Sequence, residues 1–157
     1  MASFERSAVV AAPPDAVWER VVSPEGINDE MRPWLTMRLP RSARGLTIET
    51  LPIGAVLGRA WVVLFGLLPI EYDRLAIVAV EPGRYFHEES TMLTMRWWEH
   101  RRTLSALNDE STRVTDHIEF LPRLGLMTPV MAKALYAFFG HRHRRLQRHF
   151  EAGNRED

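Results

Sequence analysis

The order of apolar and polar residues divides the chain into three regions with different patterns. Residues 3–11 have the composition of a strand, and the prolines at positions 13 and 14 suit the first turn of a helix. The apolar stripe of that helix consists of Val17, Trp18, Val21 and Val22. Ser23 suits an N-cap and precedes another proline, so a second short helix is predicted over residues 24–31. The first region therefore predicts one strand followed by two short helices.

The middle region, residues 34–121, consists of short runs of β-branched and aromatic residues separated by turn residues. The runs cover residues 34–40, 55–65, 70–80, 84–92, 96–107 and 112–121. Strands that follow one another so closely favour antiparallel pairing, because parallel strands need a long crossover connection. The pattern therefore predicts an antiparallel meander.

The third region, residues 128–152, carries apolar residues at helical spacing and predicts one long amphipathic helix. Thr128 suits the N-cap, with Pro129 at the next position. Gly140 interrupts the helix and weakens it by ~1 kcal/mol relative to alanine. This helix is the element available to cover the apolar face of the sheet. We therefore predict an α+β fold in which the long C-terminal helix covers the apolar face of an antiparallel sheet of six or seven strands.

Composition and charge narrow the classes of protein. The chain has 157 residues, which suits one domain over residues 1–152, with residues 153–157 as a disordered tail. Twenty basic residues balance twenty acidic ones, so no net field would collect phosphates, and we expect no nucleic-acid partner. The chain has no cysteine, which excludes disulfides, thiolate nucleophiles and cysteine-ligated metal sites.

The sequence also predicts a cytoplasmic protein. No signal-peptide pattern opens it, and its longest uncharged run, residues 60–70, has 11 residues against the ~20 needed to span a bilayer. It has no phosphate-cradling glycine loop, nucleophile elbow or dinucleotide fingerprint, so we expect no cofactor. Arginine outnumbers lysine nineteen to one, which hints at a GC-rich bacterial genome and carries no information on function.

Five segments follow one another over nearly the whole length of the chain: "VVAAPPDAVWERVVSPEGIN", "EPGRYFHEE", "WWEHRRTL", "TRVTDHIEFLPRLG" and "HRHRRLQRHF". In this order they resemble the helix-grip proteins of the START and birch-pollen-allergen superfamily (SRPBCC), in particular its polyketide cyclase/dehydrase-like branch. The resemblance implies a sheet curled around the last helix, with an elongated apolar cavity between them. Members include lipid and sterol carriers, coenzyme Q-binding proteins, plant hormone receptors and aromatase/cyclases, so the resemblance implies a pocket without naming its ligand.

The most charged predicted strand, residues 96–104, pairs well with residues 112–120 around a turn near Asp109. Alternation then places one almost wholly polar face in water, which carries Trp97, Glu99, Arg101, Thr103, Arg113, Thr115, His117 and Glu119. The inner face carries Trp98, His100, Arg102, Leu104, Val114, Asp116, Ile118 and Phe120. In this register Arg102 lies opposite Asp116, as expected because an unpaired buried charge is costly. The turn lacks glycine, and a slip of one residue would send one arm to the wrong face.

Three interpretations of the cluster formed by His100, Arg102 and Asp116 remain open. It can be a buried ion pair with a hydrogen-bonded histidine that fixes the register or seals the cavity. It can orient the polar head of an apolar ligand, with Arg102 pairing with an anion and His100 forming a hydrogen bond. It can be catalytic, with His100 as a general acid/base held by Asp116. Family motif positions, as the resemblance implies, fall at Trp98, His100 and Asp116.

Further residues are candidates for ligand contact. Glu88 lies on the same strand face as Phe86, and it fits an acidic position that the resemblance implies for some relatives. The apolar lining is predicted to consist of Phe86, Trp98, Ile118, Phe120, Met131, Leu135 and Phe138. Any of Trp18, Trp34 and Trp61 could also line the cavity, although buried aromatic residues are more often part of a core.

The last helix ends in a strongly basic segment that contains Arg142, Arg144, Arg145 and Arg148. A solvated basic face is the default interpretation, and transient membrane contact during ligand loading is the alternative. His141 and His143 are two residues apart and lie on different helical faces, so we expect no metal site.

We therefore predict that the chain binds a small-to-medium hydrophobic molecule, of the lipid, quinone or aromatic polyketide type, in a cavity between sheet and helix. One alternative is a cofactor-independent polyketide cyclase or dehydratase that uses His100 and Asp116 for proton transfer. Another is a pocketless structural or interaction module. A homodimer remains open.

Overall fold

The structure, a computed structural model, describes residues 1–153. The predicted tail therefore lies outside the described residues, apart from Gly153, which ends the last helix. The helices are α1 (Pro14–Val22), α2 (Pro24–Met31) and α3 (Thr128–Gly153). The strands are β1 (Ala2–Val10), β2 (Leu35–Arg38), β3 (Ala60–Leu64), β4 (Leu68–Glu81), β5 (Tyr85–Met92), β6 (Met95–Asn108) and β7 (Ser111–Pro122). Single 3₁₀ turns occur at Arg41–Ala43 and Gly125–Met127.

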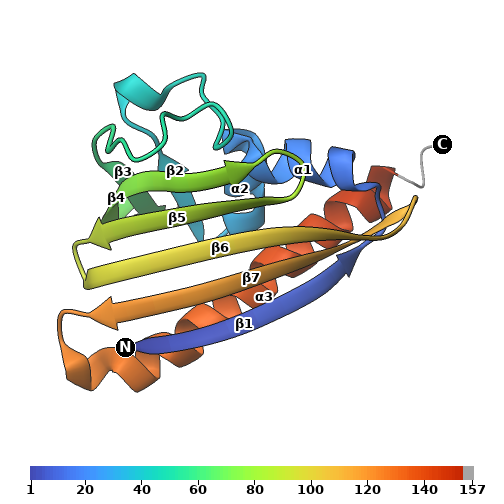
Figure 1. Ribbon diagram of the computed structural model, residues 1–157. Helices are drawn as coiled ribbons and strands as arrows, with labels where there is room; N and C mark the ends of the chain where they lie inside the picture. Colours follow the sequence, from blue (N-terminus) through green and yellow to red (C-terminus); the bar gives the residue numbers. More distant parts are fainter. Residues whose placement is uncertain (154–157) are drawn as a thin grey trace.

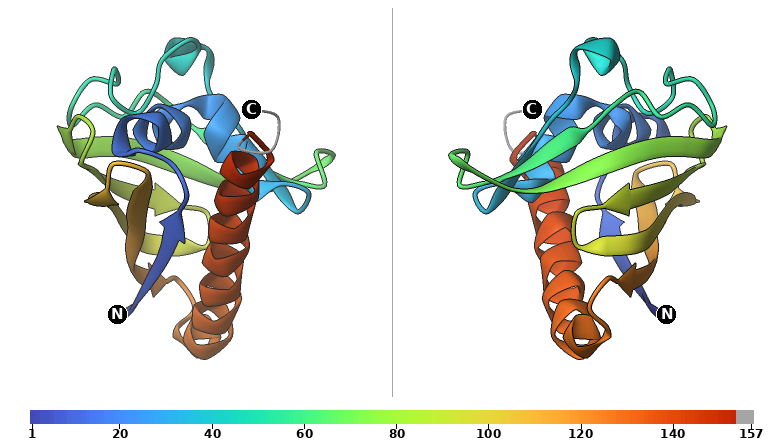
Figure 2. Two further views of the ribbon diagram at one scale, coloured as in Figure 1. Left: turned by 90° about the vertical axis from the view of Figure 1, so that its right-hand side faces the viewer. Right: turned by 90° about the vertical axis from the view of Figure 1, so that its left-hand side faces the viewer.

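The seven strands form one antiparallel sheet in the order β1-β7-β6-β5-β4-β3-β2 (Figure 1). The sheet curls into a half-barrel around α3, while α1 and α2 close one end (Figure 2). This arrangement confirms the predicted helix-grip fold, with two short helices after the first strand. The third predicted strand is shorter than expected, because residues 55–59 belong to the long connection between β2 and β3.

The junction between α1 and α2 is shaped by a serine and a glycine. Ser23 accepts a hydrogen bond from the amide of Gly26 at 3.0 Å and donates one to the carbonyl oxygen of Arg20 at 2.9 Å. A Cβ added to Gly26 would lie 1.8 Å from that carbonyl oxygen, so only glycine fits between the helices. The predicted N-cap at Ser23 is therefore confirmed, and it sets the angle at which α2 lies over the sheet.

The β6–β7 hairpin has the predicted register, with Arg102 opposite Asp116 and His100 opposite Ile118. Its glycine-free turn is held by Asn108, whose side-chain oxygen accepts hydrogen bonds from the Glu110 amide and the Ser111 hydroxyl, both at 2.9 Å. Residues 108–111 have no positive φ angle, so this turn does not require a glycine.

One outward residue of this hairpin departs from the prediction. Glu99 was expected in water, yet it is buried on the outer face of the sheet. Its carboxylate pairs with Arg101 on the same strand and lies 3.2 Å from the Nε2 atom of His87 on β5. The neighbouring long side chains therefore cover it.

The start of α3 and its interior glycine also differ from expectation. Thr128 is the first helical residue, not the N-cap, and its hydroxyl donates to the carbonyl oxygen of Gly125 at 2.8 Å. Gly140 has a packing role, because an added Cβ would lie 2.5 Å from the guanidinium carbon of Arg6 on β1. Arg6 uses this space to donate to the carbonyl oxygen of Tyr136 at 3.2 Å.

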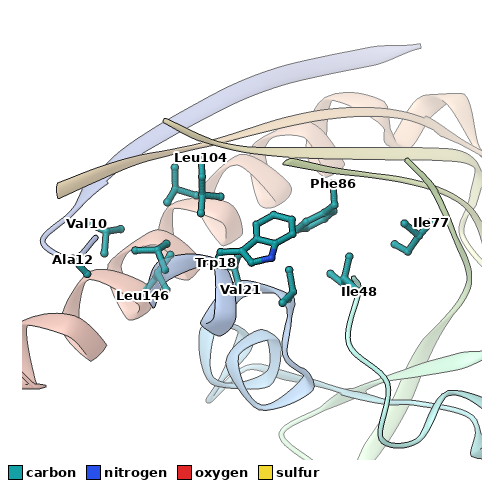
Figure 3. Close-up of a cluster of buried hydrophobic side chains, with 12 residues drawn as sticks. Val10, Ala12, Trp18, Val21, Ile48, Ile77, Phe86, Leu104 and Leu146 are labelled. Carbon is teal, nitrogen blue, oxygen red and sulfur yellow. The ribbon is translucent and has the colours of Figure 1, made fainter. Parts of the chain in front are cut away.

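The buried apolar side chains form two clusters. One surrounds Trp18 of α1 and joins the far ends of β1, β6 and α3; it includes Val10, Leu104 and Leu146 (Figure 3). The other lies toward the first turns of α3 and consists of Met92, Met95, Trp98, Ile118, Phe120 and Phe139.

Candidate ligand-binding site

A cavity of about 480 Å³ lies between the inner face of the sheet, α2, α3 and the long connection after β2. Its lining is mostly apolar and comes from elements that are far apart in the sequence. Trp34 and Met37 line it from the segment around β2, Leu46 and Leu51 from the connection. The curled sheet therefore encloses a space that α3 does not fill.

Most of the predicted ligand-contact residues line this cavity: Phe86, Glu88, Trp98, His100, Met131, Leu135 and Phe138. The remaining ones do not, and they are Arg102, Asp116, Ile118 and Phe120. These four are completely buried, with 0% exposure, where β6 and β7 lie under α3. Phe139, which lines the cavity, packs in the same buried cluster as Ile118 and Phe120.

Asp116 is the centre of a buried polar network. It accepts two hydrogen bonds from Arg102, from Nε at 2.7 Å and from an Nη atom at 2.8 Å. His100 Nε2 lies 2.7 Å from one carboxylate oxygen, and His143 Nε2 of α3 lies 2.6 Å from the other. One carboxylate thus holds together β6, β7 and α3.

Glu30 of α2 forms a second centre beside the first. Its carboxylate accepts hydrogen bonds from Arg102 at 2.7 and 2.9 Å and from Arg142 Nε at 3.1 Å. Arg102 is therefore shared between Glu30 and Asp116, so two buried guanidinium groups face two buried carboxylates. Such complete pairing is required when charges are removed from water.

The network shifts the ionisation of its members. Burial alone would raise the pKa of Asp116, but the charge of Arg102 and the hydrogen bonds from Arg102, His100 and His143 outweigh it and hold the pKa well below its ordinary value. Burial would lower the pKa of Arg102, but Asp116 and Glu30 raise it above the usual range. Both groups are therefore charged at neutral pH.

A second polar group faces the cavity and contains Asp73 of β4 with Glu88 and Ser90 of β5. The Ser90 hydroxyl donates to Glu88 at 3.1 Å, and the other oxygen of Glu88 lies 3.8 Å from Nδ1 of His100. Burial and the negative charge of Glu88 raise the pKa of Asp73 well above its ordinary value. Burial opposes ionisation of Glu88 too, but its hydrogen bonds and the attraction of His100 lower its pKa. Of the two acids, Asp73 is therefore the one that holds a proton more readily.

Sequence reasoning missed Glu30, Asp73, Arg142 and His143. The two residues of α3 had a usable signal, because Phe139, His143 and Leu146 follow one another at helical spacing on the buried face. Arg142 and His143 are buried instead of forming part of a solvated face. No comparable signal marks Glu30, whose partners are distant in the sequence.

The basic segment of α3 is partly neutralised by α2. Arg142 is paired with Glu30, and Arg145 donates to Asp29 at 2.6 Å. Arg144 and Arg148 remain exposed. The cationic surface available for a membrane is therefore smaller than the sequence indicated.

The three tryptophans considered as lining have different positions. Trp34 lines the cavity and is half exposed. Trp18 lies in the core, where its indole nitrogen donates to Glu49 at 2.6 Å. Trp61 is exposed and stacks edge-on against Tyr72.

His87, Glu89 and Glu99 come together on the opposite, outer face of the sheet. Their potential ligand atoms lie within 4.8 Å of one another, a spacing that could hold a metal ion. Sequence analysis had considered only the two histidines of α3 for this role, and His143 is bound to Asp116 instead. On the outer face, Arg101 already neutralises Glu99.

The sheet and helices have the helix-grip arrangement of START-type folds. Among solved structures, the START superfamily protein from Mycobacterium smegmatis is similar with a TM-score of 0.70 and 14% identity, over 96% of this chain and 97% of that one. The Zhui aromatase/cyclase from Streptomyces sp. R1128 has a TM-score of 0.71 and 15% identity, over 96% and 93%. Protein CV1439 from Chromobacterium violaceum has a TM-score of 0.69 and 15% identity, over 95% and 97%. At such identities the likeness shows the fold alone.

The chain belongs to a family described as a domain of unknown function (DUF8410), whose model matches residues 8–150. No curated protein matches the sequence. Within the described residues, no helix has both the length and the apolar character needed to cross a membrane.

Proposed function

We propose that this protein binds a small-to-medium hydrophobic molecule in the cavity between the sheet and α3. The observation that carries the proposal is the cavity itself, about 480 Å³ with a mostly apolar lining and a few polar groups on one wall. Cavities of roughly 300–1,000 Å³ with this character are typical of small-molecule sites. A lipid, a quinone or an aromatic polyketide of suitable size would meet these requirements.

The position of Trp34 supports an entrance beside β2. Its ring lies 5.9 Å from that of Phe65 and 6.4 Å from that of His141, and all three side chains come from different elements. Trp34 is exposed on one side and lines the cavity on the other. A ligand could therefore enter between the β2 region and α3 without disturbing the buried network.

The proposal is tested by mass spectrometry of the purified protein under native and then denaturing conditions, with organic extraction of any released compound. We expect a reproducible adduct that is lost on denaturation. Binding of the neutral fluorescent probe N-phenyl-1-naphthylamine provides a second readout. A Leu135→Trp variant, which places a large ring in the cavity, should weaken probe binding, whereas the exposed Leu126→Trp serves as its control. The absence of both an adduct and probe binding would refute the proposal.

A cofactor-independent cyclase or dehydratase activity is the second candidate. Its specific support is that His100 lines the cavity while its Nε2 atom is held 2.7 Å from Asp116. A histidine positioned in this way could transfer a proton to or from a bound polyketide. The fold is also that of the Zhui aromatase/cyclase, although this likeness alone does not indicate an activity.

This second candidate requires His100 for turnover and not for binding. Asp116 is a poor test residue, because it also holds Arg102 and His143. With a linear poly-β-ketone thioester as substrate, the parent should give a cyclised product detected by mass spectrometry. His100→Gln should abolish the product while changing probe affinity only a few-fold. Equal loss of both, or no product with the parent, would refute catalysis. The third expectation, a groove filled by bulky side chains, conflicts with the observed cavity.

A further inference from the structure

Among the described residues, three acidic ones line the cavity, namely Glu71, Asp73 and Glu88, although the fold as a whole is neutral in charge. Glu71 already accepts hydrogen bonds from the backbone amides of Leu93 and Thr94. We infer that the ligand carries a hydrogen-bond-donating polar group, a hydroxyl or an amine, and that Asp73 and Glu88 receive this group. The inference rests on the proposed binding function and specifies the chemical class of its ligand.

Asp73 provides the first argument. Its side chain lines the cavity and is 1% exposed, and its Oδ1 atom has no hydrogen-bond partner among the described residues. Native structures pair nearly all buried acceptors, and an exception requires an explanation. A donor on a bound ligand would complete the missing interaction.

Glu88 provides the second argument, because it adds negative charge at the same position. Its carboxylate is held by Ser90 at 3.1 Å and faces His100 at 3.8 Å. Burial and this charge raise the pKa of the neighbouring Asp73 and so favour its neutral form. A cationic amine could displace the proton of Asp73, whereas a hydroxyl could bind without changing the charge of the pair.

The cations near the cavity provide the third argument, since they are already paired. Arg142 lines the wall, but its Nε and Nη atoms contact Glu30 at 3.1 and 3.0 Å. Arg102, which the sequence suggested as the partner of an anionic ligand, is completely buried between Glu30 and Asp116 and does not reach the cavity. A ligand carboxylate would therefore meet the negative charge of Glu88 without a free cation.

The cavity volume limits the apolar body of the ligand. About 480 Å³ equals roughly 16 volumes of liquid water molecules at ~30 Å³ each. A ten-carbon chain with one polar group fits within this limit. 1-Decanol, decylamine and decanoic acid therefore form a matched series that differs in the polar end alone.

The experiment measures how well each of the three probes displaces N-phenyl-1-naphthylamine from the full chain at neutral pH. We expect 1-decanol and decylamine to displace it at concentrations about tenfold lower than decanoic acid, since an unpaired buried acceptor lowers affinity by about this factor.

Variants connect the preference to the two acids. Asp73→Leu should bring the affinities for 1-decanol and decanoic acid within about twofold of each other, because it removes the unpaired acceptor. Glu88→Gln should weaken decylamine more than 1-decanol. Glu89→Gln is the matched control, since Glu89 adjoins Glu88 on β5 but faces the other side of the sheet. If Asp73→Leu fails to fold, as judged by circular dichroism, the smaller Asp73→Ala replaces it; it also removes the acceptor and should likewise bring the two affinities close together.

The outcomes separate the inference from the proposed function. Decanoic acid binding as well as or better than 1-decanol would overturn the inference and leave the binding function intact. An unchanged preference in a folded Asp73→Leu or Asp73→Ala variant would also overturn it, since the donor would then bind elsewhere. Failure of the fluorescent dye and of all three probes to bind would instead refute the binding function.

Discussion

Replacing Asp116 with asparagine should test the central role of the buried network. The substitution preserves the shape of the side chain but removes its charge and part of its capacity to accept hydrogen bonds. In the parent, two guanidinium nitrogens and two imidazole nitrogens lie within 2.8 Å of the carboxylate. In the variant, Arg102 has Glu30 as its remaining anionic partner, and Glu30 is already shared with Arg142.

The expected loss of stability is about 3–5 kcal/mol, the range found when one partner of a buried ion pair is removed. It applies here because Asp116 and Arg102 are both 0% exposed, so water cannot replace the lost charge. Domains of this size are stable by about 5–15 kcal/mol, and Asp116→Asn should therefore remain folded but with a strongly lowered urea midpoint.

Urea unfolding followed by circular dichroism at neutral pH measures this loss. Glu119→Gln is the control, because Glu119 lies on the same strand but is partly exposed on the outer face, and it should change stability by about 0.5 kcal/mol or less. A loss below about 1 kcal/mol for Asp116→Asn would refute the argument that this charge is required by its buried partners.

The same residue predicts a dependence of stability on pH. The folded-state pKa of Asp116 is lowered, so its contribution is fully present above the unfolded-state value of about 4 and is lost as the pH falls toward the folded value. The difference in stability between the parent and Asp116→Asn should therefore shrink in acid. A difference that is independent of pH would contradict the assigned charge.

Three further predictions concern other parts of the fold. The pKa of Asp73 is raised in the folded state, so its contribution to stability is present below about pH 4 and is lost as the pH rises through the folded-state pKa. The Tm of Asp73→Asn relative to that of the parent should therefore increase from acid to neutral pH. Ser23→Ala removes the cap of α2 and should lower the free energy of unfolding by about 1 kcal/mol in urea titrations, and an unchanged midpoint would exclude a capping role. Gly140→Ala should stabilise the Arg6→Ala variant by about 1 kcal/mol. It should stabilise the parent by less, because the added methyl group displaces the Arg6 side chain there. Equal effects in both backgrounds of the double-mutant cycle would contradict this contact.

The hairpin shows how far alternation along single strands could predict the site. Arg102 and Asp116 were placed opposite each other because the alternative register would expose apolar residues, and the structure confirms this pairing. The same alternation placed Glu88 and His100 on the inner face, where both line the cavity. Within two paired strands, side-chain direction follows from the backbone period, so it can be predicted locally.

The predicted role of Arg102 as a contact for an anionic ligand illustrates the limit of this approach. Alternation indicates that Arg102 faces inward, but it does not show what covers that part of the sheet. In the structure, Glu30 of α2 and Asp116 of β7 bind the guanidinium group, and no part of Arg102 lines the cavity. Inward orientation and access to a cavity are therefore separate properties.

The sequence by itself determined the order and type of the elements and the register of the β6–β7 hairpin, because these follow from residue periodicity and turn chemistry. The helix-grip arrangement was implied by the resemblance of five segments to a known family. Tertiary structure alone decided which charges became partners and which acids reached the cavity. Glu30 and Arg142 are 112 residues apart in the chain, and Asp73 meets Glu88 from a neighbouring strand. These contacts depend on how α2, α3 and the curled sheet pack in three dimensions. Local sequence patterns carry no information about the distances between residues on different elements.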